Sequence, residues 1–454
     1  MFKLSKNSLV VVLIVALAAL AVGCGSRGDA TGEEESEGSR GGDKAASTEL
    51  TPGTLGDLKN VCGKGDASGK SARGVSDSTI TLSTMADPGG PFVPGLNKQF
   101  FESGDAFVKW CNAAGGINGR KLKLTKRDAK MFATAQQTIE ACETDFMIVG
   151  GGTVIDEPGV KPRVKCNLGM IPAFEISPEA IEAPLQVAPT VANTDLQLAG
   201  AFRLLAEKYP EAIKRFGTGG PDVPALISEV DKNVAAAESK GFVLVDQQQA
   251  PSQVDDWRPY VQRSQKADVK MLSPTAPGLF LQPYVQAMND IGYEPDAMTL
   301  LPQYYVPQTA EAAKTTKFPP TWVGITAWPL ELADENPATQ QAISMVKDVL
   351  PDAKLNIGHL QSINAWLLWA KSATECGDDL TVDCVLDKAG AETDWTAGGL
   401  YAPVNTDPKA KRPSECITML KVTPEGFSYD KEMTQPNDRV FNCDPANVVR
   451  VDVK

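Results

Sequence analysis

From Gly74 onward the chain alternates between short apolar runs and longer segments in which apolar residues recur every three or four positions. The first run, STITLST at residues 78–84, is rich in β-branched residues and ends at the turn sequence ADPGGP. Helical spacing follows over residues 97–114, and the sequence GGINGR ends that helix. Strand and helix signals that alternate in this way predict an α/β protein with mostly parallel sheets.

The alternation divides into two series of similar length. In the first, strands are expected at residues 78–84, 121–127, 145–151 and 169–177, and helices at 97–114 and 133–144. In the second, strands are expected at 215–220, 242–247, 269–274, 297–305 and 321–328, and helices at 196–209, 223–240, 257–266, 280–291 and 307–314. Helices at 338–349 and 359–375 follow, and beyond Gly398 the pattern changes to short strands and turns. Because about 400 residues are too many for one hydrophobic core, the pattern predicts two α/β domains.

Small and polar residues stand where these strands end. They are Gly89, Gly90, Gly151, Gly152 and Ser177 in the first series, and Gly219, Gly220, Thr275, Tyr304 and Tyr305 in the second. Ligands of open α/β sheets bind beyond the carboxyl ends of the strands, so two facing sets of loops predict a cleft. The stretch FMIVGGGTVIDE, residues 146–157, contains three consecutive glycines. We expect a small solute to approach this backbone closely, because glycine leaves its N–H group accessible.

The first residues predict an export signal. Lys3 and Lys6 precede an apolar run at residues 9–22 that is too short for a permanent membrane helix. The sequence LAVGCGS then resembles the lipobox of bacterial lipoproteins, although Ala21 stands where leucine is commoner. This resemblance implies that residues 1–23 are a signal peptide and that Cys24 carries a lipid; an ordinary signal peptide with an incidental cysteine is the alternative. Residues 25–51 contain one leucine and no aromatic residue, so residues 24–51 are expected to form a lipidated, disordered tether.

Charge argues against a nucleic-acid partner. The 454 residues carry a formal net charge of −13, with a pI of about 4.8, and no basic cluster makes a local exception. A nucleic-acid-binding surface would need a basic footprint.

The cysteine count favours disulfides. Of nine cysteines, eight remain once Cys24 is assigned to a lipid, an even number suited to an oxidising compartment. Eight cysteines allow 105 pairings, and free core thiols remain an alternative. Our working hypothesis is the sequential pairing Cys62 with Cys111, Cys142 with Cys166, Cys376 with Cys384 and Cys416 with Cys443.

Motifs for catalysis or cofactor binding fail on spacing or context. GCGSRG at residues 23–28 matches a dinucleotide fingerprint but follows no strand, and GKGDASGKS at 63–71 has the wrong spacing for a phosphate-binding loop. The only histidine, His359, lies near a helix start and is interpreted as a capping or core residue. Asp255 and Asp256 are expected to begin a helix, where acidic residues favour the helix dipole. The sequence therefore predicts no catalytic residue, no metal and no cofactor.

Three segments carry a family resemblance: GVSDSTITLSTMADPGGPF (74–92), FVKWCNAAGGINGRKLKLTKRDA (107–129) and ACETDFMIVGGGTVIDEPGVK (141–161). They resemble the start of a type I periplasmic binding protein, most closely the branched-chain amino-acid (Leu/Ile/Val) binding family of ABC importers in its lipoprotein form. DDWRPYVQRSQKADVKML (255–272) resembles a second-lobe segment, and the similarity covers roughly residues 74–375.

The resemblance implies two Rossmann-like lobes joined by three crossing strands. Lobe 1 would comprise residues 75–190 and 329–398, and lobe 2 residues 191–328 and 399–454. Family members often have a disulfide beside the ligand loop of lobe 1, and Cys142 with Cys166 matches that placement.

The resemblance also assigns ligand-binding roles. In lobe 1 the loop of Asp87 to Phe92 would touch the solute, and a carboxylate would be held by Gly151, Gly152, Thr153 and Ser177. In lobe 2 the contacts would come from Asp222, Thr275, Gln303, Tyr304 and Tyr305. Residues 303–305 stand where the amino-acid binders have an acidic residue. The ammonium of an amino acid would therefore need another carboxylate as its partner, from Asp87, Glu175 or Asp222. Each of these residues could instead belong to a turn or cap a helix. Phe92, Phe174 and the tyrosines could wrap an aromatic or aliphatic acid or a small amide; ordinary core aromatics are the alternative.

These features together predict a monomeric lipoprotein that holds a small polar solute, such as an amino acid, amide or small organic acid, and delivers it to an ABC permease. It would be anchored on the outer face of the cytoplasmic membrane. A ligand sensor that signals to a membrane receptor is the main alternative; an envelope enzyme and a purely structural surface protein are two more.

Overall fold

The computed structural model describes residues 52–251, 253–274 and 280–452. The chain separates into two units, Met1–Ala46 and Ser47–Lys454, and every described residue belongs to the second. The expected signal peptide, the lipidated Cys24, the tether and Thr275 lie outside the described residues. No helix in the described part of the chain has the length and apolar character needed to cross a membrane.

A four-stranded parallel sheet forms the first half of the fold. Its strands are β1 (Thr79–Ala86), β2 (Lys121–Asp128), β3 (Met147–Val149) and β4 (Gly169–Ile171), in the order β2-β1-β3-β4. All three pairings are parallel. The carboxyl ends of these strands therefore share one edge.

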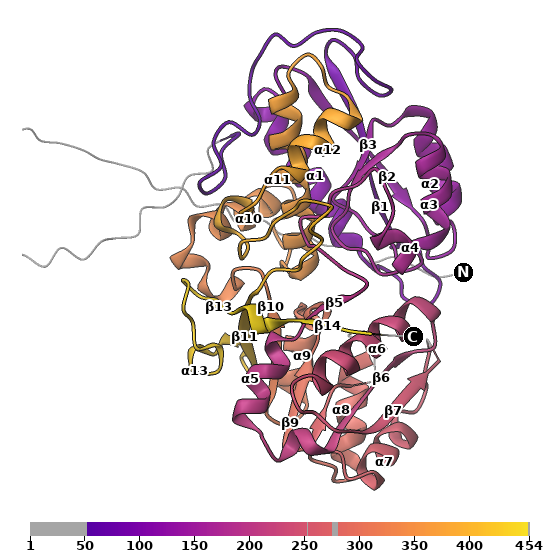
Figure 1. The fold of residues 1–454 in the computed structure, drawn as a ribbon, viewed down its shortest axis with the longest axis vertical. Helices are drawn as coiled ribbons and strands as arrows, with labels where there is room; N and C mark the ends of the chain where they lie inside the picture. The colour runs from indigo at the N-terminus through magenta and orange to yellow at the C-terminus, as the bar shows by residue number, and fades with distance from the viewer. Residues whose placement is uncertain (1–51, 252, 275–279, 453–454) are drawn as a thin grey trace, which may run out of the picture. The chain divides into compact units, whose positions relative to one another are not determined.

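Helices cover both faces of this sheet (Figure 1). One face carries α2 (Thr134–Thr144) and α3 (Glu157–Lys165), and the other carries α1 (Lys98–Ala114), α11 (Ile357–Cys376) and α12 (Val382–Gly390). Helix α10 (Pro337–Lys347) packs on α1, and the short α4 (Pro178–Ile181) follows β4. Most residues of α11 are buried, because its sequence is apolar on all sides.

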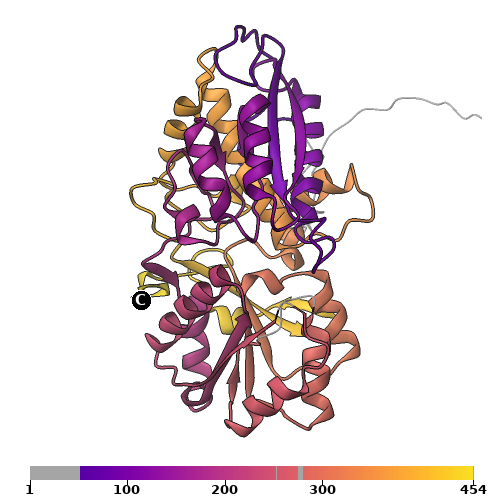
Figure 2. The same ribbon diagram turned by 90° about the vertical axis from the view of Figure 1, so that its right-hand side faces the viewer.

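The second half is an eight-stranded mixed sheet in the order β12-β11-β10-β9-β8-β6-β7, with β13 paired to β11. Its parallel strands are β6 (Phe216–Pro221), β7 (Leu244–Ala250), β8 (Met271–Leu272), β9 (Ala297–Leu300) and β10 (Thr321–Ile325). Its antiparallel strands are β11 (Cys416–Thr423), β12 (Gly426–Tyr429) and β13 (Asn442–Cys443). The flanking helices, seen again in Figure 2, are α5 (Gly200–Lys208), α6 (Pro224–Glu238), α7 (Arg258–Lys266), α8 (Leu281–Asp290), α9 (Pro307–Thr315) and α13 (Lys431–Thr434).

Three segments connect the two sheets and contact one another. They run from α4 to α5, from β10 to α10 and from η5 (Ala397–Gly399) to β11. Ala327 and Tyr401 form an antiparallel bridge between the second and third segments, and the Asn193 amide donates to the Lys411 carbonyl between the first and third. In addition, β5 (Leu196–Leu198) pairs with β14 (Val448–Arg450) near the end of the chain. This connectivity agrees with the predicted α/β fold of two lobes.

The structure differs from the predicted elements in a few places. Residues 196–209 form strand β5 and then helix α5 rather than one helix. The strand expected at 297–305 ends at Leu300, because Pro302 cannot donate to a ladder and begins a 3-10 turn, η3 (Pro302–Tyr304). Further 3-10 turns are η1 (Ala212–Arg215), η4 (Leu330–Glu335) and η6 (Pro445–Asn447).

The described residues form four disulfides: Cys62–Cys111, Cys142–Cys166, Cys376–Cys384 and Cys416–Cys443. They are the four pairs of the sequential hypothesis. The first attaches residues 52–74 to α1, and Leu55 and Val61 from this segment are buried in the core of the first half.

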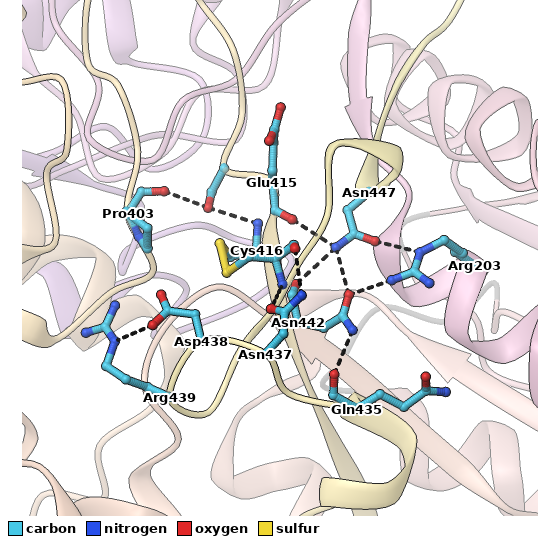
Figure 3. Close-up of a disulfide and its surroundings, with 12 residues drawn as sticks. Arg203, Pro403, Glu415, Cys416, Gln435, Asn437, Asp438, Arg439, Asn442 and Asn447 are labelled. Atoms are coloured by element: carbon cyan, nitrogen blue, oxygen red, sulfur yellow. Dashed lines mark hydrogen bonds and ion pairs between the residues drawn. A yellow bond between two sulfur atoms is a disulfide. The ribbon is translucent and has the colours of Figure 1, made fainter.

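The last disulfide lies within a hydrogen-bonded cluster that closes the second half (Figure 3). The buried Asn447 amide donates to the carbonyls of Glu415 and Asn442, at 2.8 and 3.0 Å. The Arg203 guanidinium of α5 donates to the side-chain oxygens of Asn447 and Asn442, at 2.9 and 2.5 Å. These contacts hold the segment around Asn442 and Asn447 against α5, although the two parts of the chain are far apart in sequence.

Candidate functional site

Four loops follow β1 to β4 along the shared edge of the first sheet, and Asp87 ties three of them together. Its carboxylate accepts the N–H groups of Met131, after β2, at 2.7 Å and of Val154, after β3, at 2.8 Å. Burial raises the pKa of Asp87, and the two backbone donors oppose that shift. Since both carboxylate oxygens already have protein donors, Asp87 acts as a brace within the edge.

The three consecutive glycines have close protein neighbours. A β-carbon on Gly150 would lie 2.4 Å from Trp366 Nε1, and one on Gly151 would lie 2.3 Å from the Met85 carbonyl oxygen. A β-carbon on Gly152 would lie 2.8 Å from the ring of Phe174. The Gly152 N–H group donates to the Met85 carbonyl at 3.0 Å. The structure thus gives a different reason for the glycines from the one expected: they make room for α11, β1 and Phe174.

Two predicted hydroxyl residues, Thr153 and Ser177, are buried at this edge. Thr153 Oγ1 donates to the Ile155 carbonyl at 3.4 Å, and Ser177 Oγ accepts the Ala180 N–H group at 3.2 Å and so caps α4. The Ser177 N–H group donates to the carboxylate of Asp156, at 3.2 Å. Sequence reasoning did not single out Asp156, although an acidic residue directly after a glycine loop is a usable signal.

A cavity of about 40 Å³ lies between this edge and helices α2 and α3. Its polar lining consists of the side chains of Thr134, Thr138, Thr153, Asp156, Arg163, Glu175 and Gln186. Burial raises the pKa of Glu175 to about 8, and the nearby Arg163 guanidinium opposes that shift. Burial lowers the pKa of Arg163 to about 10. The cavity has room for only roughly two or three water molecules, so it is too small for an amino acid.

Aromatic side chains occupy the outer part of the same edge. Phe174 packs against Phe100, with 5.5 Å between ring centroids. Phe92, by contrast, is 38% exposed and meets the 64% exposed Phe132 edge to face, at 6.1 Å. Phe132 follows β2 and was not among the predicted site residues; its exposure depends on a loop conformation that the sequence pattern does not reveal.

The second sheet places its predicted residues in different environments. Asp222, after β6, and Gln303, in η3, are exposed. Tyr304 is buried, and its hydroxyl donates to the Pro274 carbonyl at 3.4 Å. Burial raises the pKa of Tyr304 well above its ordinary value, so the phenol stays protonated.

Tyr305 joins the second sheet to a crossing segment and to α11. Its hydroxyl donates to Glu331 at 2.5 Å and accepts the Leu330 N–H group at 2.9 Å. Its carbonyl accepts the N–H group of Ile357, the first residue of α11, at 3.2 Å. This buried tyrosine therefore lies where the two halves of the fold are connected.

A family model described as a periplasmic binding protein matches residues 80–427. The chain belongs to the periplasmic binding protein family. A search of curated protein sequences found no match to it.

Solved structures show that this periplasmic binding protein has the type I fold. A fatty acid ABC transporter substrate-binding protein from Thermomonospora curvata shares 14% identity and a TM-score of 0.65, over 85% of this chain and 97% of that one. A solute-binding protein from R. palustris, in complex with 4-hydroxybenzoate, shares 14% identity and a TM-score of 0.61, over 78% and 96%. A leucine-binding protein from Thermotoga maritima shares 10% identity and a TM-score of 0.62, over 77% and 97%.

The residues considered for catalysis have structural roles in this binding protein. His359 caps α11: its Nδ1 accepts the Asn356 N–H group at 3.3 Å, and its Nε2 lies 3.0 Å from a carboxylate oxygen of Glu102. Asp256 accepts the Arg258 N–H group at 2.9 Å at the start of α7. Both interpretations from the sequence, a capping histidine and a helix-start aspartate, are confirmed.

Proposed function

We propose that this periplasmic binding protein captures a small solute with a polar end, such as an amino acid, amide or small organic acid, for an ABC importer. The family match over residues 80–427 is the observation that carries the proposal. The solved relatives named above are described as binding proteins for a fatty acid transporter, for 4-hydroxybenzoate and for leucine. These solutes share a carboxylate on an apolar body.

The proposed mechanism is a clamp. Residues 75–190 with 329–398 would form one lobe, residues 191–328 with 399–454 the other, and the three crossing segments the hinge. The carboxyl-end loops of both sheets would supply the facing walls. A solute that contacts both walls stabilises the closed state through its higher affinity for that state.

The described contacts refine the proposed roles of the site residues. Phe92, Asp222 and Gln303 are exposed and would touch a solute directly. Buried Asp87, Thr153 and Ser177 would act by fixing loop positions, as would Gly151, Gly152 and Phe174, which pack against protein atoms. Tyr304 and Tyr305 would couple the second sheet to the hinge. Thr275 remains a proposed contact.

A lipid on Cys24 would hold the protein on the outer face of the cytoplasmic membrane. The four disulfides support a location outside the cytoplasm, where thiols are oxidised. A Cys24→Ser variant is expected to leave the membrane fraction of cells; retention there would contradict the anchor.

A thermal-shift panel tests solute capture. Residues 48–454, oxidised and freed of copurified ligand by unfolding and refolding, would be melted with amino acids, small amides, and aliphatic and aromatic acids. A solute at about 100 times its Kd adds roughly 2.7 kcal/mol to the free energy of unfolding, which raises the Tm by a few degrees. No shift with any class, in a folded protein, would contradict solute capture.

A ligand-sensing lipoprotein remains the second candidate, because a clamp can present its closed form to a receptor instead of a permease. A neighbouring pair of permease and ATPase genes would favour transport. Solute uptake that is lost when the gene is deleted and restored by the wild-type gene would decide for transport.

A further inference from the structure

The loops after β1 and β2 present an exposed aromatic pair at the edge of the first sheet. Phe92 and Phe132 are two of the four large apolar side chains that the described residues expose, at 38% and 64%; the others are Ile139 and Val243. The two rings meet edge to face at 84° and 6.1 Å. Exposed aromatic side chains that contact one another are typical of a surface that binds an apolar partner.

The backbone beneath the pair is built for this presentation. Lys130 and Met131 have φ values of 48° and 69°, a left-handed conformation that is costly for two successive non-glycine residues. The Asp128 carboxylate accepts the N–H groups of Lys130 at 3.0 Å and of Gly89 at 3.2 Å. With the Asp87 to Met131 hydrogen bond, these contacts fasten the two loops together. One of these hydrogen bonds, from Met131 to Asp87, is buried, and strained backbone that hydrogen bonds hold in place is common in functional loops.

The loop that carries Phe132 also carries a lysine. Lys130 is exposed, two residues before Phe132, and no carboxylate of the described residues pairs with its ammonium. Its Cγ would be 3.1 Å from a β-carbon on Gly89, so the stem of Lys130 lies against the loop that carries Phe92. The edge thus offers two rings and one unpaired positive charge.

We propose that Phe92, Phe132 and Lys130 form a solute subsite for apolar carboxylic acids, with the rings on the aromatic or aliphatic body and the ammonium on the carboxylate. This inference rests on the proposed function and names its substrate class. Phe132 and Lys130 come from the loop after β2, which the sequence pattern did not indicate as a contact. Phe132 is the specificity-determining residue, because it is the more exposed ring.

The test is a calorimetric titration of the oxidised chain, residues 48–454, with four probes. Two are apolar acids, 4-hydroxybenzoate and octanoate. The third, 4-hydroxybenzamide, has the same ring as 4-hydroxybenzoate but no charge, and the fourth, acetate, has the carboxylate without the apolar body. Phe132→Ala is expected to weaken the binding of an apolar acid about tenfold or more, because burying a phenylalanine side chain contributes roughly that factor. Lys130→Gln is expected to reduce the preference for the acid over the amide.

Ile139→Ala is the matched control. Ile139 is 54% exposed and lies on α2, outside the loops that carry the pair, so its removal should leave the affinity unchanged. Equal melting temperatures of the variants would show that each is folded.

Each outcome decides the inference. Apolar-acid binding that is weakened by Phe132→Ala and unaffected by Ile139→Ala supports it. Equal affinity of wild type and Phe132→Ala, or binding of acetate alone, overturns the subsite while the proposed function stands. If a folded wild-type chain bound none of these acids nor any solute of the thermal panel, both the subsite and the proposed function would fail.

Discussion

Gly150 is the point where the loop after β3 meets helix α11. Its φ of 68° is left-handed, and a β-carbon there would lie 2.4 Å from Trp366 Nε1 and 2.9 Å from Ser362 Oγ. Gly150→Ala should therefore lower the free energy of unfolding by about 2 to 4 kcal/mol, from backbone strain plus overpacking. Urea titration of the oxidised protein measures this.

Gly292→Ala is the control for that substitution. Gly292 has nearly the same φ, 67°, but nothing lies within 4 Å of the position of its β-carbon. It should lose only about 1 to 2 kcal/mol, from the left-handed backbone. Equal losses at both positions would contradict the packing explanation for Gly150.

Glu175 should make stability depend on pH. Its pKa of about 8 in the folded protein exceeds the ordinary value of 4.5, so folding disfavours the ionised form. The folded state therefore binds more protons than the unfolded state between these values, and stability falls as the pH rises from 4.5 to 8. Glu175→Gln removes that titration. The glutamine oxygen can still accept a hydrogen bond from the Gln186 amide.

The measurement compares the variant with wild type in urea at pH 5 and pH 8. After a discount for solvent screening, we expect the stability difference to move in favour of Glu175→Gln by about 1 to 2 kcal/mol. A difference that stays constant with pH would show that Glu175 ionises normally.

At the residue scale, the sequence located the loops better than the contacts within them. Most of the glycines and hydroxyls expected at strand ends do lie there, because that rule depends only on strand order. It did not indicate that Asp87 is buried between two other loops, or that Phe132 is exposed, because both follow from tertiary contacts.

At the element scale, helix periodicity located most helices, and the exceptions have physical reasons. Helix α3 was missed because Pro158, Gly159 and Pro162 are poor helix residues, although prolines in the first turn are tolerated. The pairing of β5 with β14 joins residues about 250 positions apart, which no local pattern reveals. Strand β9 is shorter than predicted, because Pro302 cannot donate to a ladder.

The disulfide between α2 and α3 should contribute more to the free energy of unfolding than a disulfide that closes a shorter loop. Cys142 and Cys166 are separated by 24 positions, and Cys376 and Cys384 by 8. On the chain-entropy estimate, replacing the first pair with serine should cost about 3.5 kcal/mol and replacing the second about 2.5 kcal/mol. Unfolding in urea without reductant measures both; a larger loss for the shorter loop would contradict this order.

At the scale of the whole molecule, the proposed clamp requires that solute binding and hinge motion occur together. Tyr305 links η3 to Leu330 in a crossing segment and to Ile357 at the start of α11. The Ala327 to Tyr401 bridge joins two crossing segments. The proposed hinge would let the two α/β halves change their separation without repacking either core.

Small-angle X-ray scattering with and without a bound solute tests the clamp most directly. The sample is the oxidised chain, residues 48–454, and the solute is one that calorimetry shows to bind. We expect the radius of gyration to fall when the site is saturated, because the lobes close on the solute. An unchanged radius of gyration, with binding established on the same sample, would contradict the clamp.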